Sequence, residues 1–90
     1  MSQKSGQITI TGVTQFPDIH CTAAGIKAHP DNTDTIWIGN DGSNIVGSGT
    51  GFPLNAGEAI IVVLEYENLN TLYAVADVAD EKVCWILADA

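Results

Sequence analysis

The chain has 90 residues, of which 46% are hydrophobic and 16% are charged. This length suits a single domain, and the composition is too apolar for intrinsic disorder and too interrupted by polar residues for a membrane span. Eleven acidic residues against three lysines give a formal net charge of -8, so a phosphate backbone would be repelled. We therefore expect a small acidic globular domain that binds neither nucleic acid nor a membrane.

The first six residues, MSQKSG, are polar and lack the apolar core of a signal peptide. We expect residues 1–6 to form a flexible N-terminal arm and residues 7–90 to form one β-sandwich domain. Without an export signal, the chain is expected to fold in a reducing cytoplasm. Cys21 and Cys84 are then better explained as buried thiols than as a disulfide, although their pairing stays open.

The N-terminal half contains three extended segments. Apolar and polar residues alternate from Gln7 to Phe16, which predicts one strand with a bulge or bend at Gly12. Residues 23–28 predict a second strand in which Ile26 and Ala28 face away from Lys27. A polar reversal at residues 31–34 then leads into a strand over residues 35–39, so these last two strands are expected to form a hairpin.

The C-terminal half is organised around one apolar strand. Residues 40–51 predict a long loop with a short edge strand near residues 44–47, and residues 53–57 predict a tight turn. The strand over residues 60–64 is apolar throughout and rich in β-branched side chains. Two further strands are expected over residues 71–76 and 82–88.

These segments define the expected fold class. They amount to about seven short strands separated by turn residues, with no long helical pattern between them. Parallel β-α-β units are excluded because no crossover helix is available. The sequence therefore predicts an all-β protein, either an antiparallel β-sandwich or a small barrel.

Two of the predicted strands are apolar on both faces, whereas a sandwich strand normally buries one face and exposes the other. Residues 60–64 show this pattern, and so does the last strand, in which Val83, Trp85 and Leu87 alternate with Cys84, Ile86 and Ala88. Either the loops and the N-terminal arm cover the second face, or another subunit does.

Metal and calcium sites are weakly indicated. His20, Cys21, His29 and Cys84 lack the paired spacing of zinc ligands. A group of loop residues resembles a calcium site in composition only, and Asx turns explain it more simply; it comprises Asp31, Asn32, Asp34, Asn40, Asp41 and Asn44. We therefore expect no metal and no cofactor.

Catalytic motifs are equally weak. The glycine-rich residues 47–51 lack the lysine and following helix of a phosphate-binding loop, and no serine lies in a nucleophile elbow. We expect no catalytic residues and no enzyme activity.

Aromatic side chains are the best candidates for an interface. Phe16, Trp37, Phe52 and Trp85 are the residues that we expect to contact a partner. In its predicted strand Trp37 points opposite to Ile36 and Ile38, so either the tryptophan or the isoleucines lie outside. Trp37 is either half-buried beneath the long loop or an anchor for a partner chain or a sugar ring.

Several short motifs together resemble those of small virion proteins of tailed bacteriophages. They are Gly25-Ile26-Lys27-Ala28, Asn32-Thr33-Asp34-Thr35-Ile36-Trp37-Ile38-Gly39, Gly51-Phe52-Pro53-Leu54 with Ala56-Gly57-Glu58, Asn68-Leu69-Asn70 with Leu72-Tyr73, and Val83-Cys84-Trp85-Ile86. The similarity covers most of residues 7–88, and its motifs are turns and strand starts. Asp34 and Trp37 depart from the glycine and tyrosine that are common at these places in that family.

The resemblance implies a non-enzymatic structural protein of the virion. The expected role is a capsid decoration (cement) protein that binds the head shell as a homo-oligomer, with a trimer favoured. Its partners would be the major capsid protein or other virion subunits, and its location the virion, assembled in the bacterial host cytoplasm. The alternative is a carbohydrate- or receptor-binding module, or a β module of the tail, neck or fibre.

Overall fold

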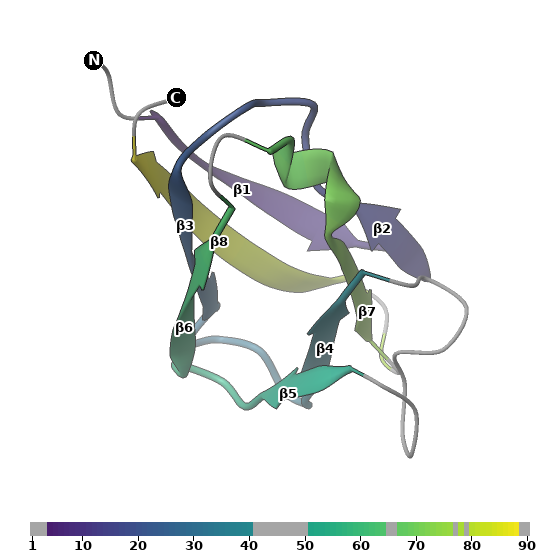
Figure 1. The fold of residues 1–90 in the computed structure, drawn as a ribbon. Coiled ribbons are helices and arrows are strands. Elements are labelled where there is room, and N and C mark those ends of the chain that lie inside the picture. Colours follow the sequence, from purple (N-terminus) through teal and green to yellow (C-terminus); the bar gives the residue numbers. More distant parts are fainter. Residues whose placement is uncertain (1–3, 41–50, 65–66, 77, 79, 89–90) are drawn as a thin grey trace.

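The computed structural model describes residues 4–40, 51–64, 67–76, 78 and 80–88. Eight β-strands form two four-stranded antiparallel sheets that pack face to face (Figure 1). This arrangement confirms the predicted all-β antiparallel sandwich. None of the described segments forms a helix with the length and hydrophobicity needed to cross a membrane.

Each sheet combines strands from both halves of the chain. Sheet A has the order β1 (Lys4–Ile10), β8 (Glu81–Ala88), β3 (Ala23–Ala28) and β6 (Ala59–Val63). Sheet B has the order β2 (Val13–Gln15), β7 (Tyr73–Ala76), β4 (Ile36–Gly39) and β5 (Phe52–Leu54). A 3-10 helix, η1 (Leu69–Thr71), precedes β7.

The core lies between the two sheets, because alternate side chains of each strand point inward. In β3, for example, Ala24, Ile26 and Ala28 are buried while Lys27 is exposed, as the sequence predicts. The largest fully buried side chains come from both sheets and the connections between them: Ile10, Phe16, Cys21, Ile26, Ile36, Leu54, Leu69, Val83 and Leu87. Burial of this apolar surface is the main stabilising contribution to the fold.

The N-terminal segment differs from the prediction in two ways. Residues 4–6, which were expected to belong to the flexible arm, are part of β1 and pair with β8. The single bent strand expected over residues 7–16 is instead two strands in different sheets. Gly12 has a φ of +73°, which a glycine adopts without steric cost, and the chain passes from sheet A to sheet B there.

The predicted hairpin of residues 23–28 and 35–39 is wrong, because β3 lies in sheet A and β4 in sheet B. The connection between them is tied to the start of β8. Asn32 uses its side chain to donate to the Lys82 carbonyl and to accept from the Lys82 N–H, each at 2.8 Å. These contacts hold residues 31–34 across the end of the sandwich rather than in a tight reversal.

The predicted turn at residues 53–57 is displaced by two residues. Pro53 lies inside β5, an edge strand, where its missing N–H is tolerated. The reversal runs from Asn55 to Glu58: the Glu58 N–H donates to the Asn55 carbonyl at 2.9 Å, and Gly57 has a φ of +84°. The edge strand predicted near residues 44–47 lies outside the described residues.

Glu81 is the buried polar residue of the described core, and its carboxylate organises the β3–β4 connection. It accepts from the Thr33 N–H at 3.0 and 3.1 Å and from the Thr33 hydroxyl at 2.8 Å. Glu81→Gln replaces one acceptor oxygen with a donor and should lower the free energy of unfolding by about 1–3 kcal/mol. Urea denaturation measures the loss. Exposed Glu67→Gln is the control, and equal stability of the two variants would contradict the role of Glu81.

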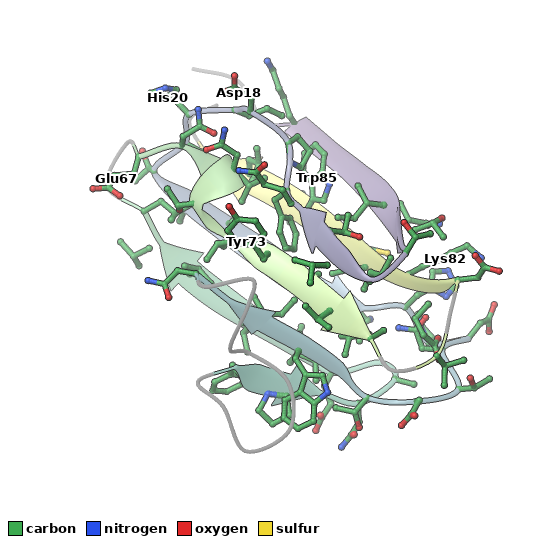
Figure 2. The ribbon with its side chains drawn as sticks, turned by 90° about the vertical axis from the view of Figure 1, so that its right-hand side faces the viewer. Asp18, His20, Glu67, Tyr73, Lys82 and Trp85 are labelled. Carbon is green, nitrogen blue, oxygen red and sulfur yellow. The ribbon has the colours of Figure 1, made fainter. Side chains whose placement is uncertain are left out.

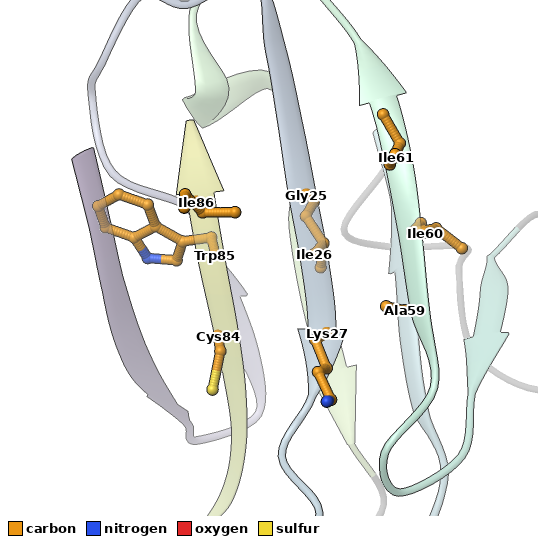
Figure 3. Close-up of a pocket in the computed structure, with 9 residues that line it drawn as sticks. All are labelled: Gly25, Ile26, Lys27, Ala59, Ile60, Ile61, Cys84, Trp85 and Ile86. Carbon is orange, nitrogen blue, oxygen red and sulfur yellow. The ribbon is translucent and has the colours of Figure 1, made fainter. Parts of the chain in front are cut away.

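Gly6 makes room for a tryptophan. The Trp85 ring extends from β8 toward β1 (Figure 3), and Gly6 and Trp85 are paired across the two strands. A Cβ atom at position 6 would lie 2.5 Å from Cζ2 of Trp85. The ring therefore lies against the backbone of β1 at Gly6.

Gly6→Ala should therefore lower the free energy of unfolding by about 1–3 kcal/mol, because the ring has to move away from the core. Chemical denaturation measures the effect, and Ser5→Ala is the neighbouring control. In the Trp85→Leu background the same substitution should cost much less. A cost that stays the same in both backgrounds would show that the ring is not the cause.

Candidate interaction surface

Two of the four predicted interface residues belong to the interior. Phe16 is only 2% exposed and is part of the core, so its assignment to an interface is wrong. Its N–H donates to the Leu72 carbonyl at 3.1 Å, which holds the residue between the layers. Trp85 points to the inner side of β8, on the same face as Val83 and Leu87, and packs partly buried against the core.

Trp37 and Phe52 lie elsewhere and on different surfaces. Trp37 is on the outer face of sheet B and is half-buried, whereas its neighbours Ile36 and Ile38 are buried, which resolves the alternative left open by the sequence. Its indole Nε1 is buried, so the polar tip does not reach the surface. Phe52 is 55% exposed at the edge of β5. The four aromatic residues therefore do not form one site.

The two most exposed large apolar side chains of the described chain lie instead on the outer face of sheet A: Ile61 is 79% exposed and Val63 is 68% exposed. Ile86, which is 54% exposed, lies on the same face. They come from β6 and β8, the two strands that the sequence shows to be apolar on both faces. Sequence reasoning found these strands, but its predicted interface residues were aromatic and only Trp85 lies in either strand, whereas the exposed positions are occupied by aliphatic residues.

The strand register places these side chains in rows across the sheet. Gly25 of β3 pairs with Ile86 on one side and with Ile61 on the other. Because glycine has no side chain, the two isoleucines flank a shallow hollow of about 310 Å³ with Gly25 at its floor (Figure 3). The next row, Ala88, Ala23 and Val63, extends the apolar surface. We call the surface formed by Ala23, Gly25, Ile61, Val63, Ile86 and Ala88 the outer apolar face.

A basic row adjoins the outer apolar face. Lys27 of β3 pairs with Cys84 of β8, and Lys82 is the neighbouring outward residue of β8, two residues before Cys84. All three lysines of the chain lie in strands of sheet A, and no carboxylate belongs to the outward positions of its four strands. In Figure 2, Lys82 lies at one end of the molecule, whereas Asp18 and Glu67 lie at the other. Among the described residues, the outward positions of the four strands of sheet A therefore carry positive but no negative charge.

The residues considered above as candidate metal ligands are not assembled in the described part of the chain. It contains no cluster of three or more His, Cys, Asp or Glu side chains able to hold an ion. Asp34 accepts from the Thr35 N–H at 2.8 Å, and Asn32 binds the backbone of Lys82, so these two residues order the connection. Asp41 and Asn44 of the suggested calcium group lie outside the described residues.

The two cysteines are free thiols and do not form a disulfide. Cys21 is buried in the core, as expected, but Cys84 is only half-buried on the outer side of β8. Its Sγ lies 3.9 Å from the Gln7 side-chain oxygen. The Cys84 thiol therefore lies beside the two lysines on the outer side of sheet A, and the Cys21 thiol lies in the core.

Comparisons with known proteins find no matching family model, no matching curated protein and no matching solved structure.

The two thiols should react at very different rates. Burial raises the pKa of Cys21, so at a given pH a smaller fraction is thiolate, and the core also excludes reagents. We expect iodoacetamide to alkylate Cys84 at least about tenfold faster than Cys21 in the folded chain. Peptide mass spectrometry measures both rates. The Cys84→Ser variant should take up label only after denaturation; rapid labelling of the folded variant would contradict this placement of Cys21.

Proposed function

We propose that the chain is a non-enzymatic structural protein that works by docking its outer apolar face onto another protein. The observation that carries the proposal is the exposure of Ile61, Val63 and Ile86 on the side of sheet A that faces away from the core. Contiguous apolar surface of this kind marks interaction sites in small domains. The setting suggested by the motif resemblance is the virion of a tailed phage, where the chain would decorate the head shell.

The chemistry of the face suits a protein partner. Removing a large aliphatic side chain from water contributes roughly 1.5–3 kcal/mol, so a few such residues drive docking. The hollow at Gly25 accepts a protruding side chain, and Lys27 offers a cation beside it. A partner with an apolar centre and acidic groups at one margin would be complementary.

The proposed partner is the major capsid protein or another virion subunit, met during assembly in the bacterial cytoplasm. A decoration protein occupies many equivalent places on one particle, so a modest affinity at each place is sufficient when copies also contact one another. The high negative charge keeps the free protein soluble before it meets the shell.

Head binding provides the test. Expanded heads of the phage that encodes the chain, prepared without it, are mixed with purified protein and sedimented. Ile86→Asp should weaken binding at least about tenfold, because it places a charge in the apolar row. Val13→Asp is the matched control, since Val13 is equally exposed, at 54%, but lies in sheet B. Equal binding by both variants, or no binding by the wild type, would overturn the proposal.

A second candidate function rests on the exposed Phe52. This ring and the polar residues Asn55 and Glu58 line a hollow between β5 and β6, and an aromatic surface beside hydrogen-bonding groups suits a sugar ring. Under this alternative the chain would be a carbohydrate-binding module of the virion. Glycan-array binding that is lost in Phe52→Ala but kept in Ile86→Asp would favour it over head decoration.

A further inference from the structure

The two sheets have four edge strands, and three of them carry features that hinder pairing with another strand. In β5, Pro53 lacks the N–H that a ladder needs. β2 has only three residues. β1 begins with Lys4 and carries polar outward side chains, Ser5, Gln7 and Thr9. Charged residues, proline and short length are the usual protections of sheet edges.

β6 has none of these protections. Its sequence, Ala59-Ile60-Ile61-Val62-Val63, contains no charge, no proline and no polar side chain, and it ends the strand order of sheet A. Figure 1 shows it at the margin of the molecule. Its inward-facing residues, Ile60 and Val62, are only half-buried, and no described strand pairs with β6 on the side away from β3. Within the described part of the chain, β6 is therefore incompletely buried on its outer face, on its inner face and along its edge.

The hydrogen bonds between β6 and β3 show which backbone groups of β6 are available to another strand. Leu64 donates its N–H to the Thr22 carbonyl at 2.7 Å, and Glu58 accepts from the Ala28 N–H at 2.9 Å. In an antiparallel ladder the bonded residues alternate, so Ile60 and Val62 also bond toward β3. The N–H and C=O groups of Ala59, Ile61 and Val63 then lie in the plane of the sheet and point beyond its edge, away from β3.

This pattern of outward-pointing groups fits a second copy of the same strand. A two-fold axis at Ile61 pairs Ile61 with Ile61 of the second copy and Ala59 with Val63 of the second copy. All these residues are the ones whose backbone groups point outward, so every pair exchanges both of its hydrogen bonds. If the register between the two β6 strands shifted by one residue, each outward-pointing residue of one copy would face a residue of the other copy that already bonds to its own β3. This register is therefore excluded.

The same arrangement also completes the packing. Outward side chains of one copy continue those of the other, so the two outer apolar faces merge into one continuous surface. Ile60 and Val62 gain the equivalent residues of the second copy as neighbours on the inner side.

No charged side chain of β6 lies at this contact. Two chains with a net charge of -8 meet along a strand without charged side chains, beside Lys27 of β3. The carboxylate that precedes the strand, Glu58, accepts from the Asn55 N–H at 2.7 Å and is held at the turn.

We propose that two copies of the chain pair through antiparallel β6 strands, forming a continuous eight-stranded sheet across a two-fold axis. This proposal deepens the proposed function, since it gives the docking protein a defined oligomeric unit and doubles its outer apolar face. It predicts a dimer, whereas the motif resemblance favours a trimer. A trimer would need a contact between two different surfaces of the chain.

Sedimentation velocity of the purified chain and of two variants at position 61 tests the pairing. Ile61→Pro removes an N–H that points out of the sheet, so it should leave the monomer folded while weakening the dimer at least about tenfold. Ile61→Thr keeps the N–H and the β-branched shape and should remain a dimer. A monomeric or trimeric wild type, or a dimer that survives Ile61→Pro, would overturn the proposal.

Cross-linking provides a second measurement that does not depend on the proline variant. Paired residues at the axis have Cα atoms about 5.5 Å apart, within the range of a disulfide. In the Cys84→Ser background, Ile61→Cys should therefore oxidise rapidly to a covalent dimer, whereas Ile86→Cys should not. Fast cross-linking of Ile86→Cys alone would show that the faces stack, and that a different dimer forms.

These experiments separate the dimer from the proposed function. If Ile61→Pro is monomeric, and Ile86→Asp loses head binding while it remains a dimer, both proposals stand. If the wild type binds heads but never forms a dimer, the β6 pairing fails and the docking role remains. If the dimer forms but heads are not bound, the pairing stands without the decoration role.

Discussion

A two-layer sandwich has one interior, and this constraint governs the whole molecule. Eight strands can bury only the side chains that point between the sheets, yet β6 and β8 carry aliphatic residues on both faces. The inner set, with Val83 and Leu87, forms the core. The outer set, with Ile61 and Ile86, has no third layer to cover it within the described chain. The exposed face is a direct consequence of the strand sequence and the number of layers.

The polar interactions serve to keep this architecture in register. Glu81 and Asn32 tie the connection between the sheets to the first residues of β8, and Gly6 lets the Trp85 ring lie over β1. Both contacts act on β8, which lies between β1 and β3 in sheet A. The strand that presents Ile86 is therefore held both at its first residues and through the Trp85 ring.

Sequence reasoning located the exposed apolar face only in part. The two-faced apolar pattern pointed to the strands that carry this face, because the period of two in a strand makes both faces visible in the sequence. The choice of Phe16, Trp37, Phe52 and Trp85 followed the general enrichment of aromatic residues at interfaces, which does not say which face of a strand is inside. Phe16 and Trp85 pack inward, while Ile61, Val63 and Ile86 carry the exposed surface.

The amino-acid sequence alone determined the fold class, the alternation within β3 and the two-faced character of β6 and β8, because these depend on local spacing and side-chain chemistry. Only the tertiary structure decided that Gly12 and residues 31–34 carry the chain between sheets rather than through a bend and a hairpin, that β6 ends a sheet, and that Gly25 lies between two exposed isoleucines. These features depend on which strands become neighbours. Strand order is settled by pairing between segments far apart in the chain, which local spacing does not record.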